Sequence, residues 1–180
     1  MPEPADCQWL AGGVVYTPRA VQDRIRVAAN ALIVRDGKVL LVEFGGGTDR
    51  EHYNFPGGGV ELGETLEEAV RREVREEVCL DVEVERLLLI VESIGSRNTN
   101  SIGGERIPWN EVRFFFLCTP PDGAEPRMPA TPDNDFQSAV RWVPIESLPD
   151  INVLPQVSQA LRQALKDDAT RPWIVANPHP

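Results

Sequence analysis

Cysteine and histidine are scarce in this 180-residue chain, which contains three of the first and two of the second. The cysteines, Cys7, Cys79 and Cys118, are odd in number and lie in dissimilar surroundings, which argues against a disulfide framework. We therefore expect the protein to work in a reducing cytoplasm.

Long apolar runs are missing as well. Stretches such as Leu87–Val91 are far shorter than the roughly 20 residues that a membrane-spanning helix needs. The N-terminus carries Glu3 and Asp6 and shows no apolar core of the signal-peptide type. We expect no association with membranes.

Basic residues are outnumbered, with 18 Lys and Arg against 28 Asp and Glu and a net charge of −10. A general nucleic-acid binder needs a basic face, so this class is disfavoured. The hydrophobic content of 42% is ordinary for a soluble globular protein, and 180 residues suit one domain with a sizeable core.

The apolar pattern predicts a mixture of strands and helices. Strands are expected over Val27–Val34, Val39–Phe44, Val82–Val91, Val112–Cys118 and Ala139–Val143, and helices over Leu66–Val78 and Val157–Leu165. Asp36–Gly37 between the first two strands indicates a hairpin with a type I′ turn. Thr65 and Glu68 match the capping-box pattern at a helix start. This order predicts an α/β (α+β) sandwich.

Acidic residues crowd the first of these helices. Its apolar stripe consists of Leu66, Ala69, Val70, Val74 and Val78. Glu73 and Glu77 project into the same stripe, one turn apart. A solvated charged face explains Glu68 but not this pair, because two ionised carboxylates on a buried stripe need cations or strong donors. We interpret the pair as metal ligands.

The ligand type favours a hard cation. The cluster offers only oxygen, with no cysteine pair or histidine at ligand spacing, which argues against zinc. Mg²⁺ takes one or two carboxylates together with water and substrate phosphates. Arg72 is either an ordinary surface arginine or the partner that orients a carboxylate.

One motif brings these residues together. The segment reads Gly58-x5-Glu64-x7-Arg72-Glu73-Val74-x-Glu76-Glu77-x-Cys79-Leu80 and is preceded by Phe55-Pro56-Gly57. It resembles the signature of the Nudix hydrolases, and the flanking pattern extends the likeness over roughly residues 25–165. The one departure is Cys79, where the family has a glycine suited to positive φ at a helix end.

The resemblance implies a Nudix-type α/β/α sandwich with a mixed sheet between helices. We expect an N-terminal extension over 1–24, a Nudix hydrolase domain over 25–168 and a C-terminal tail over 169–180. It also implies metal-dependent hydrolysis of a diphosphate linkage in a nucleoside diphosphate-X substrate. The alternative is a catalytically weak nucleotide-binding or regulatory module. Three clustered carboxylates favour the enzyme, and only Cys79 favours the module.

Roles can be assigned within the motif. The predicted metal ligands are Glu73, Glu77, Glu76 and the carbonyl of Gly57, with Mg²⁺ as the ion and Mn²⁺ as its alternative. The predicted catalytic residues are Glu76, Arg72 and Glu64. Glu76 is a third ligand, a general base or a solvated residue. Glu64 either orients Arg72 or caps the first helical turn.

Several residues outside the motif stay open. Glu111, Asp133 and Asp135 are candidate bases among which the sequence does not choose. His52 is more typical of a surface residue than of a substrate contact. Trp109 is either a base-stacking residue or, more in keeping with its type, a partly buried anchor. The expected partner is a small nucleotide or nucleotide derivative, and a homodimer is left open.

Overall fold

The computed structural model describes residues 25–47, 51–93, 99–102, 105–108, 110–132, 135–166 and 173–176. A nine-stranded mixed sheet forms its centre, in the order β10-β3-β2-β1-β8-β5-β11, with β4 paired to β1 and β9 paired to β2. Its strands are β1 (Arg26–Arg35), β2 (Lys38–Phe44), β3 (His52–Asn54), β4 (Gly57–Gly59), β5 (Glu83–Ser93), β8 (Glu111–Thr119), β9 (Gln137–Pro144), β10 (Val153–Leu154) and β11 (Trp173–Ala176). The helices are α2 (Leu66–Val78), α3 (Ser158–Lys166) and the 3-10 helix η1 (Ile145–Asp150).

Strand β1 lies at the middle of this sheet. It runs parallel to β8 and antiparallel to both β2 and β4. The β1–β8 register places Arg26 opposite Glu111, although 85 residues separate them in the sequence. Parallel pairing therefore joins two charged residues that no local pattern connects.

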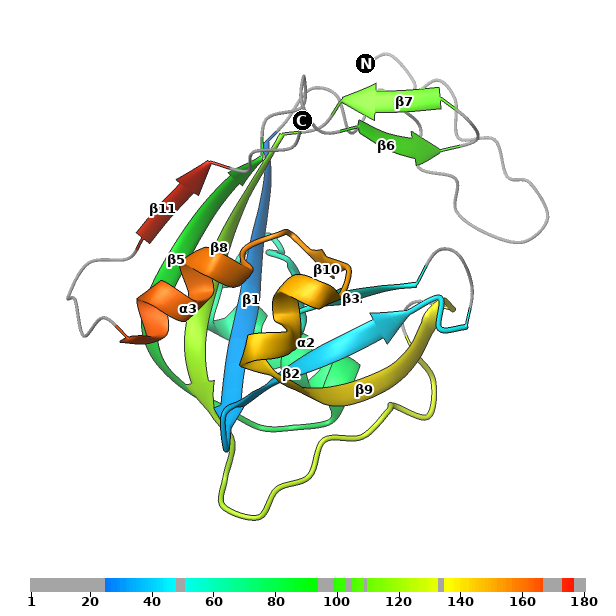
Figure 1. Ribbon diagram of the computed structural model, residues 1–180. Helices are drawn as coiled ribbons and strands as arrows, with labels where there is room; N and C mark the ends of the chain where they lie inside the picture. Colours follow the sequence, from blue (N-terminus) through cyan, green and yellow to red (C-terminus); the bar gives the residue numbers. More distant parts are fainter. Residues whose placement is uncertain are drawn as a thin grey trace.

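The two helices cover opposite faces of the sheet, as Figure 1 shows with α3 (orange) in front of the strands and α2 behind them. The residues of β2 alternate between the two cores. Leu40 and Val42 belong to the cluster that includes the apolar stripe of α2. Val39 and Leu41 belong to the cluster that includes Leu161 of α3. This strand is apolar on both faces because both are buried, and the predicted α/β/α sandwich is confirmed.

The hairpin and the helix ends follow the sequence signals. Asp36 and Gly37 have φ values of 49° and 71°, the positive pair that a type I′ turn requires. Thr65 caps α2 in a full capping box with Glu68. Cys79 ends the helix in the left-handed conformation, with φ at 54°.

The structure contains short strands that the sequence did not predict. An antiparallel pair lies between β5 and β8 in chain order, with strands β6 (Thr99–Ile102) and β7 (Glu105–Pro108). The expected tail over 169–180 contains β11, which pairs in parallel with β5. Such short segments have no hydrophobic period of their own and depend on a partner strand.

Trp109, Asp133 and Cys7 lie outside the described residues. Within the described ranges, every helix is too short or too polar to cross a bilayer.

Candidate functional site

Helix α2 meets strand β4 through two carboxylates and two glycines. The Gly57 N–H donates to Oε2 of Glu77 at 2.8 Å. A Cβ atom placed on Gly58 would lie 2.5 Å from Oε1 of Glu73. A Cβ on Gly57, whose φ is +145°, would lie 2.4 Å from the carbonyl oxygen of Ala29. Only glycine therefore lets β1, β4 and the α2 carboxylates approach so closely.

Arg72 organises the acidic side chains around it. Its Nη2 and Nε donate to the two carboxylate oxygens of Glu64, at 2.7 and 3.2 Å. Nη1 donates to Glu73 at 2.8 Å and to Glu76 at 3.1 Å, and Nη2 also reaches the carbonyl of Gly59 at 2.9 Å. The planar guanidinium can hold this many acceptors at once. Arg72 is thus an integral part of the cluster, and Glu64 is its two-point partner.

The carboxylates on Arg72 differ in their electrostatics. Only 13% of the Glu73 side chain is exposed, and burial raises the pKa of this carboxyl although Arg72 opposes the shift. The hydrogen bond from Arg72 lowers the pKa of Glu64. Glu64 is therefore well compensated as an anion, whereas Glu73 is an anion short of positive partners. A further cation would relieve this deficit.

The donor set fits a hard divalent cation. Glu73, Glu76 and Glu77 offer carboxylate oxygen only, the ligand type that Mg²⁺ and Mn²⁺ prefer. In the described part of the chain, no three acidic, histidine or cysteine side chains already converge on one point. Two of these carboxylates face Arg72 and the third faces the Gly57 N–H. The N–H of Gly57 contacts Glu77. The predicted binding of the ion by the carbonyl of Gly57 stays a prediction.

A cavity of about 360 Å³ opens beside Glu77. It is lined by Arg26, Phe44, Gly45, His52, Asn54, Gly57, Gly58, Glu77, Arg113 and Phe136. The rings of Phe44 and His52 stack with centroids 5.3 Å apart, and Phe136 is 69% exposed. One cavity thus combines an acidic end, two arginines and aromatic faces. His52, which the sequence favoured as a plain surface residue, belongs to its wall.

Glu111 links the two arginines of this cavity. Its side chain is 2% exposed, and its oxygens accept from Nη1 of Arg26 at 2.7 Å and from Nε of Arg113 at 2.5 Å. A role for Glu111 as a base stays a prediction, and the contacts show it as an ion-pair partner. Asp135 is exposed in a turn, and it is not among the residues that line the cavity.

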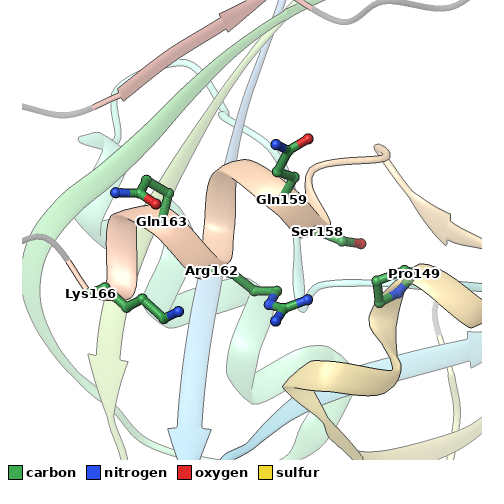
Figure 2. A pocket seen from close by; sticks show the side chains of 6 residues that line it. All are labelled: Pro149, Ser158, Gln159, Arg162, Gln163 and Lys166. Carbon is green, nitrogen blue, oxygen red and sulfur yellow. The ribbon is translucent and has the colours of Figure 1, made fainter.

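A second hollow, of about 430 Å³, lies beside α3 (Figure 2). Its lining residues are Pro149, Ser158, Gln159, Arg162, Gln163 and Lys166. Those on α3 lie away from Leu161 and Ala164, which form the buried side of the helix. Among the described residues, the lining includes no carboxylate, so the described part of this hollow lacks the ligands of a hard cation.

Five cavity side chains were missed by the sequence interpretation: Arg26, Phe44, Asn54, Arg113 and Phe136. A signal existed for the arginines. Arg113 interrupts the apolar strand Val112–Cys118, and Arg26 directly precedes the apolar strand Val27–Val34. A charge in such a place needs a partner or a ligand.

The NUDIX domain family matches residues 24–167. The chain belongs to this family. The matched region includes the α2 carboxylates, Arg72, the glycines of β4 and every described residue that lines the 360 Å³ cavity.

Relatives of this Nudix protein include two curated proteins. An ADP-ribose pyrophosphatase from Methanocaldococcus jannaschii is 42% identical over 67 residues, which cover 37% of this chain and 40% of the relative. The human 8-oxo-dGDP phosphatase NUDT18 is 35% identical over 112 residues, 62% of this chain and 30% of the relative. The chain therefore spans well under half the length of these relatives.

The fold is shared with solved structures. A NUDIX hydrolase from Nitrosomonas europaea superposes with a TM-score of 0.62 at 23% identity, over 79% of this chain and 90% of the other. At this identity the likeness shows the fold alone.

Proposed function

We propose that this Nudix protein hydrolyses the diphosphate linkage of a nucleoside diphosphate derivative with the help of Mg²⁺, or Mn²⁺ in its place. The observation that carries the proposal is the single cavity that joins Glu77 and the β4 glycines to Arg26 and Arg113. Oxygen ligands for a cation and arginines for phosphate are the two requirements of metal-assisted phosphoryl chemistry. The names of the two curated relatives, which refer to nucleoside diphosphate compounds, support the substrate class.

The α2 carboxylates would hold the ion. Glu73, Glu77 and Glu76 are the proposed ligands, with the carbonyl of Gly57 as a fourth. A bound ion would lower the pKa of water and offset charge that develops on the phosphates. Its positive charge would also compensate Glu73, whose pKa is raised by burial.

The remaining motif residues have supporting roles in this proposal. Glu76 is 38% exposed on its side chain, so water reaches it and it can accept a proton as well as bind a cation. Arg72 keeps Glu73 and Glu76 in place through Nη1, and Glu64 fixes Arg72 through its two-point contact. We assign Arg72 and Glu64 to positioning.

The aromatic side of the cavity fits the nucleoside part. His52, which stacks on the buried Phe44, and the exposed Phe136 offer ring faces on which a base can stack. We still expect a cytoplasmic location, domain boundaries at 24/25 and 168/169, and a small nucleotide as the partner. A homodimer stays open.

The rival function is a module that binds nucleotides without cleaving them. Cys79 favours it, because a non-glycine residue holds the left-handed position that ends α2. The test incubates the pure protein with Mg²⁺ and ADP-ribose, 8-oxo-dGDP, nucleotide sugars and dinucleoside polyphosphates, and measures phosphate products. We expect turnover that requires the metal and is lost in Glu73→Gln. Binding with no product from any compound would favour the module.

A further inference from the structure

We propose that Glu111 is a positioning residue that holds Arg26 and Arg113 together as a two-armed clamp for the phosphates of the substrate. The inference rests on the proposed function and names the residues that hold the anion. It assigns to Glu111 a role other than that of a base.

The sheet register brings the three side chains together. Arg26 begins β1 directly opposite Glu111, which begins the parallel strand β8. Glu111 and Arg113 are two residues apart on β8 and so share one face of the sheet. Each Glu111 oxygen binds a different arginine, at 2.7 and 2.5 Å. This arrangement fixes the spacing of two cations that would otherwise repel each other.

The arginines place cationic donors on the cavity wall. Two guanidinium groups share the one buried carboxylate of Glu111. Both arginines line the cavity, whereas Glu111 is 2% exposed and lies behind them. Arginine presents several donors in a planar fork that matches phosphate oxygens. The same wall includes Glu77, next to the proposed metal ligands.

A purely structural ion pair exists elsewhere in the molecule and serves as a control. Glu43 is also buried, at 4% exposure, and it binds Arg141 with help from Ser138 and Tyr53. Neither Glu43 nor Arg141 lines the cavity. Glu43→Gln therefore removes the same chemistry as Glu111→Gln, a buried glutamate paired with arginine, outside the proposed clamp.

The test measures binding of methylenediphosphonate, a diphosphate analogue that resists hydrolysis, by titration calorimetry with Mg²⁺ present. We expect Glu111→Gln to weaken the affinity by at least about tenfold, a loss of about 1.4 kcal/mol. Glu43→Gln should stay within about twofold of the native protein. Arg26→Met, at a side chain that is 41% exposed, should weaken binding to a similar extent without loss of the fold. If Glu111→Gln does not fold, the Arg26→Met variant still tests the clamp.

Steady-state kinetics supply a second readout. On whichever nucleotide is cleaved, Glu111→Gln should raise KM by about tenfold and leave kcat within about threefold, because the clamp binds ground state and transition state alike. A loss in kcat alone would assign Glu111 to the chemistry and overturn the inference. So would equal affinities in Glu111→Gln and Glu43→Gln, or a native protein that does not bind the diphosphonate.

Failure of the proposed function is a distinct result. If no nucleotide is cleaved but the diphosphonate binds and Glu111→Gln releases it, the hydrolase proposal fails and the clamp stands. If a nucleotide is cleaved and Glu111→Gln binds the diphosphonate as the native protein does, only the clamp fails.

Discussion

Glu43 on β2 and Glu73 on α2 are two largely buried glutamates, each paired with an arginine, and their electrostatics are opposite. The side chains are 6% and 13% exposed, respectively. The hydrogen bond from Arg141, with help from Ser138 and Tyr53, lowers the pKa of Glu43. Burial raises the pKa of Glu73, and the contact with Arg72 does not reverse this shift.

The difference lies in what surrounds each carboxylate. Glu43 lies between β3 and β9, whose side chains supply three separate donors. Glu73 faces the glycine strand β4, which has no side chains, and the arginine that it binds, Arg72, also binds Glu64 and Glu76. Arg26 adds a smaller electrostatic attraction. A carboxylate with all its donors is a structural element, whereas one that is short of them is the one that the proposed cation would compensate.

The largest expected effect is on turnover. Glu73→Gln should lower the rate of nucleotide hydrolysis by at least about a hundredfold through loss of metal-stabilised charge. Glu43→Gln should stay within about threefold of the native rate, since its carboxylate is outside the site. Rates measured on the same substrate at limiting Mg²⁺ check this contrast. Similar rates in the two variants would remove the distinction between the two glutamates.

The effects on stability should be the reverse of those on turnover, so that Glu43→Gln destabilises the protein and Glu73→Gln does not. Glu43→Gln should lower the free energy of unfolding by about 1–2 kcal/mol, because it weakens a set of charge-assisted hydrogen bonds. Glu73→Gln should make the metal-free protein more stable than the native one at neutral pH, because it removes an undercompensated buried charge. Urea denaturation in a chelating buffer measures both values.

The pH dependence of stability should have opposite signs for Glu43 and Glu73. The lowered pKa of Glu43 stabilises the fold above the unfolded value, near 4.5, and this contribution is lost as the pH falls through the folded value. The raised pKa of Glu73 destabilises the metal-free fold as the pH rises from about 4.5 through the folded value. Relative to the native protein, Glu43→Gln should be less stable at pH 7 and Glu73→Gln more stable, and acidification should remove both differences. Melting curves from pH 7 to pH 3 test this, and a difference of the same sign in both variants would contradict it.

The smallest effect is expected at Cys79, which ends the helix that carries Glu73. Its φ of 54° suits glycine better, so Cys79→Gly should raise stability by about 1 kcal/mol or less. Turnover should stay within a few-fold of the native rate. A large loss of activity would show that the thiol contributes to the site.

Local signals made α2 and its carboxylates predictable. The capping box at Thr65 and Glu68, the apolar stripe and the positions of Glu73 and Glu77 all depend on neighbours within a few turns. The Asp36–Gly37 hairpin is equally local. In each case the residue types themselves carry the backbone preference.

The other half of the cavity could not be predicted in this way. Arg26 and Glu111 meet only because β1 pairs with β8 in parallel, and a parallel register is set by the whole sheet. Phe136 joins them from the turn before β9. Strand β4 consists of three glycines and has no apolar period at all. The acidic half of the candidate site can therefore be predicted from the sequence. The cationic half depends on how the strands pair in the fold.

The central claim, that the α2 carboxylates hold a divalent cation, is tested most directly by thermal melts with and without Mg²⁺. An ion that binds only the folded state adds about 2.7 kcal/mol at a hundred times its dissociation constant, which should raise the Tm of the native protein by about 5 °C or more. Glu43→Gln should show the same rise from its own lower starting point. In the double variant Glu73→Gln, Glu77→Gln the rise should largely disappear. An equal rise in the native protein and the double variant would contradict the claim, because the ion would then bind elsewhere.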